Sequence, residues 1–460
     1  MHAVATTMES TPPGTGRTRR SPWRVVVGGG LASAVSPGPI ALSTLSLFVV
    51  PITLEMGFGR TVVTSAYTVG AIGVAIGTVF VGRLLSTFTV RHILIPSFIL
   101  FGLSVMAIGL TPPNIALYYL PYFLLGIFGS GTILPLIKAV VSWFDNKRAL
   151  ASGVYAAITA VGSSIMPLLA GLLIAGFGWR GAYFVLGMIP IVFGTIMVWL
   201  FVRGRAERHE RGRLLQETTE DGKDVSLELP GLTFREATRT RYFWQIVFGL
   251  GPVGMVLIAL QVNLVPMMTD RGLTVAEAAL LLTVLGVSSL LGRLLGGFLI
   301  DRLHVRIIAP TIILAPIIGI LLLQEPFLQA AGAVAFIGFT FGVEHDLLPV
   351  IVTRYLGMRA FGKNLGVLQA TFTFTTALGP VLMGIGYDVF GSYDAVIPVL
   401  IGVLVACAVV VFFLGQYRYP PIDGFDKLAA ENELAAAEKL SVIAATETIP
   451  TVEAPKRRRA

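Results

Sequence analysis

The sequence predicts an all-α membrane protein with twelve transmembrane helices, arranged as two six-helix halves related by a pseudo-two-fold repeat. Its composition, its apolar segments and an internal repeat support this fold class. Of the 460 residues, 55% are hydrophobic and 13% are charged, and the mean hydropathy is +0.80. Soluble domains carry about 25% charged residues, and a water-soluble fold of this length cannot bury so much apolar surface. The composition therefore excludes an ordinary soluble enzyme, a disordered chain and a nucleic-acid-binding module.

The apolar segments are long enough to cross a bilayer. A helix needs about 20 apolar residues to span about 30 Å of hydrocarbon. Twelve segments meet this measure: 24–54, 61–81, 93–111, 115–141, 149–176, 181–202, 242–267, 277–300, 307–324, 327–352, 364–387 and 395–415. The chain therefore divides into an N-terminal tail (1–23), a first half (24–202), a central loop (203–241), a second half (242–415) and a C-terminal tail (416–460).

The positive charges predict the orientation of these spans. If the N-terminus lies in the cytoplasm, nearly all of the 34 Lys and Arg residues fall on the cytoplasmic side, and only Arg60, Arg180 and Arg271 lie on the other. The positive-inside rule then favours cytoplasmic tails and a cytoplasmic central loop in a multi-pass protein of the cell membrane. The net charge of +8 thus reflects the lipid bilayer as partner, and no nucleic-acid partner is expected.

An internal repeat relates the two halves. A parallel repeat of six-helix units is typical of transporters whose halves rock about a substrate site near the midplane of the membrane. Four residues of the fifth span and its exit loop recur 213 residues later: Gly153, Pro167, Gly171 and Gly178 correspond to Gly366, Pro380, Gly384 and Gly391.

A second repeated motif carries a family resemblance. Residues 297–306 read Gly297-Phe-Leu-Ile-Asp301-Arg302-Leu-His-Val-Arg306, and the earlier copy, residues 82–91, lacks the Asp and the middle Arg. The motif resembles the signature loop of the major facilitator superfamily. The resemblance implies the major facilitator fold and a cytoplasmic latch, weaker in the first half, which is formed by Gly82, Arg91, Gly297, Asp301, Arg302 and Arg306.

Three further features resemble one branch of that superfamily, the oxalate/formate antiporters and monocarboxylate transporters. They are the segment 143–153 (Trp-Phe-Asp-Asn-Lys-Arg-Ala-Leu-Ala-Ser-Gly), the sequence Gly178-Trp179-Arg180, and a single arginine, Arg293, in the span 277–300. In that branch an arginine of the eighth span is implicated in binding the substrate carboxylate. The resemblance therefore implies the same role for Arg293.

The position of Arg293 supports this role independently. It lies eight residues before Asp301, or about 12 Å deeper at 1.5 Å per residue. An ionisable group at bilayer depth is a functional candidate, and the planar guanidinium suits a carboxylate. Ser289 and Gly296 leave space beside it. The alternative is a structural arginine that pairs with Glu344, with Asp346 or with backbone carbonyls.

The span 327–352 contains Glu344-His345-Asp346 near mid-membrane. Such groups can take up a proton on one side and release it on the other, so we expect them to couple transport to protons. The alternatives are a fixed counter-ion for Arg293 or a structural hydrogen-bonded cluster. Three consecutive residues are poorly spaced to hold one metal ion and lack a fourth ligand, so no metal site is expected.

Other polar residues at span depth are candidates for the substrate-binding cavity. No P-loop, HExxH, GxSxG or Cys pair occurs, so the sequence predicts no catalytic residues, no cofactor and no enzyme. The candidate cavity residues besides Arg293 are Gln261, Asn263, Tyr67, Tyr155 and Gln369.

These features predict a monomeric secondary-active transporter of a small organic anion, a carboxylate, that works by alternating access. Proton coupling or anion exchange would drive it. One alternative is an exporter of hydrophobic compounds on the same fold, which needs no arginine for its cargo. Another is a transporter-shaped sensor that signals through its C-terminal tail, residues 416–460.

Overall fold

A computed structural model describes residues 23–143, 148–202, 231–323, 327–357 and 359–419, and these residues are almost entirely helical. The first half comprises α1 (Trp23–Ser33), a π-helical turn η1 (Gly38–Leu42), α2 (Leu45–Met56), α3 (Arg60–Thr87), α4 (Val90–Gly109), α5 (Ile115–Ser142), α6 (Arg148–Ile189), η2 (Pro190–Gly194) and α7 (Thr195–Phe201). The second comprises α9 (Phe234–Ala237), α10 (Arg241–Asp270), α11 (Val275–Arg302), α12 (Val305–Leu322), α13 (Phe327–Tyr355), α14 (Phe361–Phe390) and α15 (Ile397–Phe412).

The twelve predicted spans are present in the described part of the chain. Ten helical segments are long and apolar enough to cross a membrane, and one of them, Leu150–Phe201, is 52 residues long. Gly178 divides that segment into the fifth and sixth spans, because its φ of 69° and ψ of 172° are not helical. A positive φ is readily adopted only by glycine. The shorter helix α15, with 16 residues, is the twelfth span.

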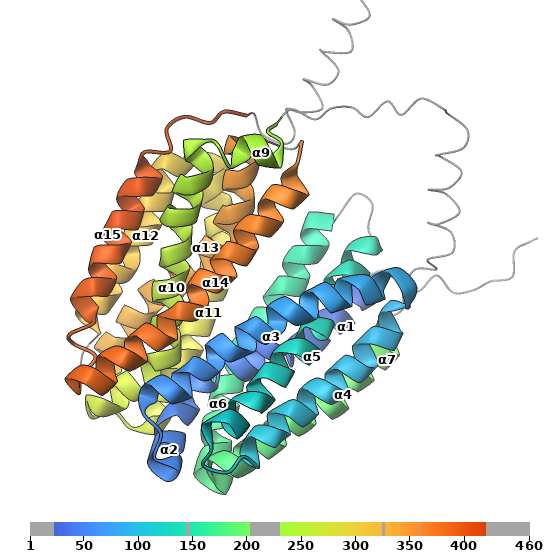
Figure 1. The fold of residues 1–460 in the computed structure, drawn as a ribbon, viewed down its shortest axis with the longest axis vertical. Coiled ribbons are helices and arrows are strands. Elements are labelled where there is room, and N and C mark those ends of the chain that lie inside the picture. The colour runs from blue at the N-terminus through green and yellow to red at the C-terminus, as the bar shows by residue number, and fades with distance from the viewer. Residues whose placement is uncertain (1–22, 144–147, 203–230, 324–326, 358, 420–460) are drawn as a thin grey trace, which may run out of the picture.

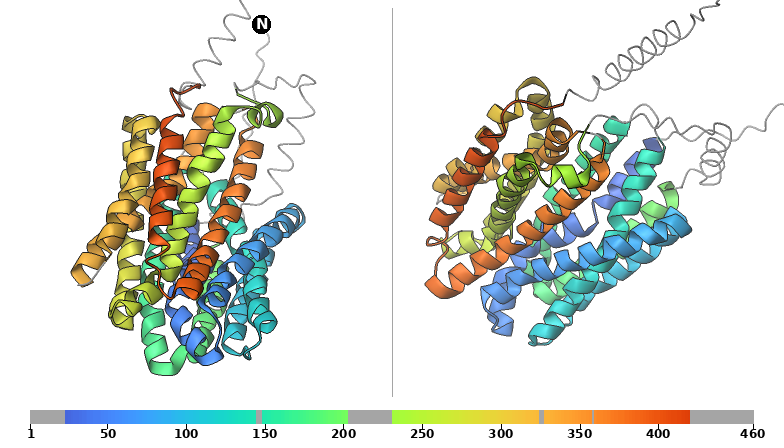
Figure 2. Two further views of the ribbon diagram at one scale, coloured as in Figure 1. Left: turned by 60° about the vertical axis from the view of Figure 1, so that its left-hand side comes forward. Right: turned by 45° about the horizontal axis from the view of Figure 1, so that its top comes forward.

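The spans form two bundles that correspond to the predicted halves. In the first, α5 packs against α3 and α4, and α6 packs against α1 and α4; in the second, α13 packs against α11 and α12, and α10 packs against α14 and α15. The bundles meet where α3 contacts α14, where α6 contacts α11, and where α2 contacts α10 (Figures 1 and 2).

Glycines at equivalent positions allow close packing in both halves. A Cβ atom at Gly126 of α5 would overlap the carbonyl oxygen of Gly70 in α3. A Cβ atom at Gly338 of α13 would likewise overlap the carbonyl oxygen of Leu285 in α11. Small residues permit such close helix contacts in membranes. The internal repeat of the sequence is thus also a repeat of helix packing.

The two ends of the bundle differ. We call the end where α1 begins and α15 ends the terminal end, and the end that carries the turns 57–59 and 271–274 the distal end. Figure 1 shows the halves meeting near the distal end and diverging toward the terminal end. Near the distal end the Val265 amide donates to the Ser46 hydroxyl at 2.8 Å, and the Thr64 hydroxyl donates to the Pro380 carbonyl at 3.0 Å. The two halves are therefore joined at the distal end.

Candidate functional site

A central cavity of about 350 Å³ lies between the two halves. Residues of α3, α6 and the first span line it from one half, and residues of α10, α11, α13 and α14 line it from the other. The polar lining residues are Ser43, Tyr67, Thr159, Ser163, Gln261, Ser289, Arg293, Glu344, Gln369, Thr373 and Thr376. A site built from both halves is where a rocking transporter binds its substrate.

The first span is interrupted where it meets the cavity. α1 ends at Ser33, and the π-helical turn that begins at Gly38 follows Pro37. Proline cannot supply a backbone N–H to a regular helix, so the segment Pro37-Gly38-Pro39 breaks the helix. The Ser43 hydroxyl donates to the Gly38 carbonyl at 3.1 Å and steadies the turn. Such π-turns are frequent at functional sites, and here the turn places Gly38 and Ser43 at the cavity wall.

Arg293 is half-buried in α11 and lines the central cavity. It also lines a second cavity of about 630 Å³, which we call the vestibule. The vestibule lies toward the terminal end, where Val140 of α5 and Ser152 of α6 line it. The Nε atom of Arg293 is buried, and no hydrogen-bond partner is found for it among the described residues. Arg293 therefore lies where the two cavities meet.

Glycines beside Arg293 bring α11 close to α13, on which Glu344 lies. A Cβ atom at Gly292 would overlap the carbonyl oxygen of Phe339 in α13, and one at Gly296 would approach the side chain of Val343 to within 2.7–3.1 Å. The α11 residues Leu282, Leu285, Gly286 and Ser289 line the cavity together with Arg293. They recur at intervals of three or four residues, so they share one face of the helix.

Glu344 of α13 lines the same cavity as Arg293 and is only 6% exposed. The structure thus brings together the arginine and one of the acidic groups that the sequence singled out. The side chains of His345 and Asp346 lie outside the described residues. Among the residues that the structure describes, one cationic and one acidic side chain line the cavity.

Three further predicted residues, Tyr67, Gln261 and Gln369, line the central cavity. The Oε1 atom of Gln261 is buried without a hydrogen-bond partner in the described part of the chain. Tyr155 instead lines the vestibule, where its hydroxyl donates to the Ser33 hydroxyl at 2.9 Å.

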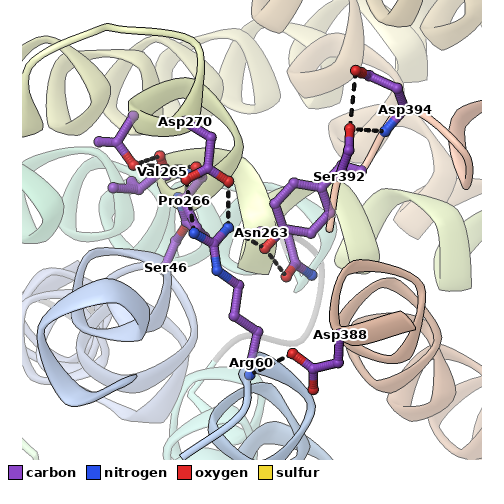
Figure 3. A network of polar contacts seen from close by, with 11 residues as sticks. Ser46, Arg60, Asn263, Val265, Pro266, Asp270, Asp388, Ser392 and Asp394 are labelled. Carbon is purple, nitrogen blue, oxygen red and sulfur yellow. Dashed lines mark hydrogen bonds and ion pairs between the residues drawn. The ribbon is translucent and has the colours of Figure 1, made fainter. Parts of the chain in front are cut away.

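The structure does not place Asn263 at either cavity. It is fully buried, its side-chain amide donates to the Ala259 carbonyl at 2.9 Å, and its Oδ1 accepts a hydrogen bond from the Tyr393 hydroxyl at 3.3 Å. It belongs to a polar network at the distal end (Figure 3). Gln261 and Asn263 are two residues apart on α10, so they face directions about 200° apart.

Sequence reasoning missed the hydroxyl groups of the cavity wall. Thr159 and Ser163 come from α6, and Thr373 and Thr376 come from α14. Single Ser and Thr residues are common in transmembrane helices, where they hydrogen-bond to the preceding turn. Thr373 does so with the Gln369 carbonyl at 2.9 Å. For Thr373 and Thr376 the available signal was their helical spacing from Gln369, which places all three on one face of α14.

The predicted latch is described only in part. Arg91 donates to the Trp199 carbonyl, Arg302 lies over the Phe298 ring with its Cζ atom 4.1 Å from the ring centre, and Arg306 lies over the Phe412 ring at 4.8 Å. Each of these contacts stays within its own half. Gly82 is exposed in α3, while the side-chain positions of Gly297 and Asp301 lie outside the described residues. The latch therefore stays a prediction.

Known proteins resemble this chain in sequence. The family model of the Major Facilitator Superfamily matches residues 31–357 and 246–452. Monocarboxylate transporter 12 of Mus musculus is 28% identical over 302 residues, which are 60% of this chain and 62% of that protein. The match thus spans less than two thirds of that relative. A probable sulfoacetate transporter of Cupriavidus necator is 23% identical over 360 residues, covering 74% of this chain and 82% of the relative.

Solved structures resemble it in fold. The crystal structure of a D-xylose–proton symporter superposes with a TM-score of 0.66 at 13% identity, over 85% of this chain and 97% of that one. A bacterial homologue of the lysosomal transporter Spinster, in an inward-facing and unoccupied conformation, gives a TM-score of 0.64 at 16% identity, over 86% and 95% of the two chains. Together with the twelve spans, the repeat and the cavity between the halves, these matches show that the chain belongs to the major facilitator superfamily and is similar to its monocarboxylate transporter branch.

Proposed function

We propose that this protein is a secondary-active transporter that carries a small organic anion through the central cavity, with Arg293 as the residue that binds the anion. Arg293 carries the proposal, because it lines both cavities and its buried Nε atom has no hydrogen-bond partner among the described residues. A guanidinium in a cavity favours a carboxylate that can accept two parallel hydrogen bonds. The names of the relatives, a monocarboxylate transporter and a probable sulfoacetate transporter, agree with an acidic substrate.

The vestibule indicates the route. It connects Arg293 with the terminal end, so in this conformation the anion enters or leaves there. The excess of Lys and Arg in the segments at this end favours a cytoplasmic location under the positive-inside rule. The proposed state is therefore open to the cytoplasm, in a protein of the cell membrane.

Glu344 provides a means of coupling transport to protons. It lines the cavity that contains Arg293, so a proton on this carboxyl group changes the charge that the anion meets. Proton symport through Glu344 and exchange for a second anion are the two driving forces that we propose.

Uptake into proteoliposomes tests the binding role. Labelled monocarboxylates, dicarboxylates and sulfonates are supplied to the wild type, to Arg293→Gln and to Arg293→Lys. Loss of a buried charge partner should reduce uptake at least about 30-fold in Arg293→Gln, and Arg293→Lys should recover only part of it because lysine lacks the planar fork. Arg235→Gln, which removes an exposed charge from the short helix α9, is the matched control.

Two outcomes would contradict the proposal. Unchanged anion uptake by Arg293→Gln would remove Arg293 from the binding site. Transport of lipophilic cations in place of anions would favour the hydrophobic-compound exporter. Deletion of residues 420–460 should leave uptake intact, whereas a sensor that signals through this tail would lose its output.

A second uptake experiment tests the coupling. An imposed proton gradient should stimulate uptake by the wild type and leave Glu344→Gln unaffected. If the variant keeps this stimulation, protons are not carried on Glu344. If neither protein responds to the gradient but both need an anion inside the vesicle, exchange is the driving force.

A further inference from the structure

A second arginine, Arg60, joins the two halves at the distal end. It is the first residue of α3, yet its side chain lies among residues of the second half (Figure 3). Its two terminal nitrogens bind both carboxylate oxygens of Asp270, at 2.6 and 2.7 Å, and one of them also donates to the Tyr393 hydroxyl at 3.0 Å. The Tyr387 ring centre lies 3.6 Å from the Arg60 Cζ atom. Arg60 is only 8% exposed, so this contact is largely shielded from water.

The backbone at the start of α3 also depends on the second half. The first amides of a helix lack partners within the helix, and the N-cap residue, Gly59, offers no side chain. Asp388 of α14 fills this role from across the interface, because its Oδ1 accepts from the Arg60 amide and its Oδ2 from the Thr61 amide, each at 3.0 Å. A Cβ atom at position 59 would lie 2.7 Å from the carboxylate, so the glycine makes room for this cap.

The equivalent helix of the second half, α11, needs no such help. Its Thr274 hydroxyl accepts from the Glu277 amide at 3.2 Å, and the Glu277 carboxylate accepts from the Thr274 amide at 2.8 Å. This capping box closes the helix start from its own sequence. The cap of α3 is thus present only while the distal ends of the two halves touch.

We propose that Arg60, Asp270 and Asp388 form the distal gate of the transport cycle, as positioning residues that hold the cavity closed at this end. The inference rests on the proposed transport function, because a rocking motion that opens the distal end must separate α3 from α10 and α14. That motion breaks the bidentate Arg60–Asp270 ion pair and removes the Asp388 cap from the N-terminus of α3 at the same time. In the state described here, the gate favours access from the terminal end.

Spin-label distances in lipid nanodiscs test the gate directly. Leu110 follows α4 and Leu328 lies in the first turn of α13; both are at the distal end, and they are 76% and 81% exposed. Cys407, the single cysteine, is first replaced by alanine, and the two leucines are then replaced by labelled cysteines. In substrate-free protein, the distal-open population should rise at least about 30-fold in Asp270→Asn, because a shielded ion pair loses one partner. Asp388→Asn should shift it in the same direction.

The matched control is Glu55→Gln. Glu55 also pairs with an arginine at the distal end, but its partner Arg180 belongs to the same half, at 2.8 Å. This variant should leave the distance distribution unchanged. Arg60→Lys keeps the charge and loses the fork, so it should give a shift between wild type and Asp270→Asn. Each variant is used only if its elution profile in size-exclusion chromatography matches that of the wild type, which shows that it is folded.

Unchanged distances in both Asp270→Asn and Asp388→Asn would overturn the gate, and so would an equal shift in Glu55→Gln. The measurement uses no substrate, so it separates the gate from the proposed function. A distance shift with no anion uptake by the wild type would retain the gate and reject the anion. Normal anion uptake without a distance shift would reject the gate and retain the anion transporter.

Discussion

The distal turns of the two halves each contain a glycine with a positive φ but use their acidic residue differently. Glu55 stands two residues before Gly57, whose φ is 70°, and Asp270 stands two residues before Gly272, whose φ is 98°. The two acids occupy equivalent positions of the repeat. Glu55 forms its ion pair within its own half, whereas Asp270 forms its pair with the other half.

The partner position explains the difference. In the first half Arg180 follows Gly178 by two residues, and in the second half Tyr393 follows Gly391 by two residues; both glycines have a φ of 69°. Tyrosine cannot neutralise Asp270, so Arg60 of the other half does so and donates to the Tyr393 hydroxyl as well. Two differences within the repeat, Arg180 against Tyr393 and Arg60 against Val275, thus accompany the change from a contact internal to a half to a contact between halves.

The largest expected effect comes from comparing the two ion pairs by double-mutant cycles. Arg60→Gln with Asp270→Asn should give a coupling energy of about 2 kcal/mol on the distal-closed equilibrium, in the range for close, shielded charge pairs. The side chains of Arg60 and Asp270 are 9% and 33% exposed, against 39% and 50% for Arg180 and Glu55. Solvent screens the second pair, so its cycle should give less than about 0.5 kcal/mol. Equal coupling energies would remove the distinction between the halves.

Tyr393→Phe should give a smaller effect on the same equilibrium. It removes the hydroxyl that accepts from Arg60 and donates to Asn263, at 3.0 and 3.3 Å, while the Arg60–Asp270 pair remains. Loss of a hydrogen bond to a charged group costs about 1.5 kcal/mol. Spin-label distances should show a distal-open population between those of the wild type and Asp270→Asn. A shift as large as that of Asp270→Asn would make the tyrosine the main element of the gate.

The two halves also differ in how the equivalent helices α3 and α11 are capped at their N-termini. Thr274→Ala removes the N-cap side chain of α11 and should lower thermal stability by about 1 kcal/mol without moving the distal equilibrium, because that cap lies within one half. Asp388→Asn should move the equilibrium instead. Scanning calorimetry and spin-label distances on the same samples distinguish the two, and a distance change in Thr274→Ala would contradict the assignment.

The spans and the position of Arg293 at a cavity could be predicted from the sequence, because both follow from local properties of the chain. Apolar length indicates a span, and a single charge deep within one indicates a cavity. Apolar length alone predicted one span over residues 24–54, and the π-turn that Pro37 and Pro39 produce within it became apparent only in the structure. Lengths and charges of this kind are read from neighbouring residues.

The gate could not be predicted in the same way. Arg60 was counted only as a loop charge, since its partners Asp270 and Asp388 are 210 and 328 residues away in the chain. Nothing in its local sequence indicates that the second half surrounds it. Asn263 was assigned to the cavity for the converse reason, because depth along a helix does not tell which face a side chain takes.

The smallest expected effect concerns Asp394, which has no acidic counterpart in the first half. Hydrogen bonds from Arg271 and then Ser392 hold the pKa of Asp394 below its ordinary value of 3.8. A lowered pKa in the folded state adds stability above that ordinary value, and this stability is lost as the pH falls through the folded-state pKa. The Asp394 side chain is 70% exposed, so its pair with Arg271 should contribute less than about 0.5 kcal/mol. Asp394→Asn should therefore melt slightly below the wild type at pH 7, with the difference disappearing as the pH falls through the folded-state pKa of Asp394. A difference that grew on acidification would mean that the carboxyl group is stabilised in its protonated form.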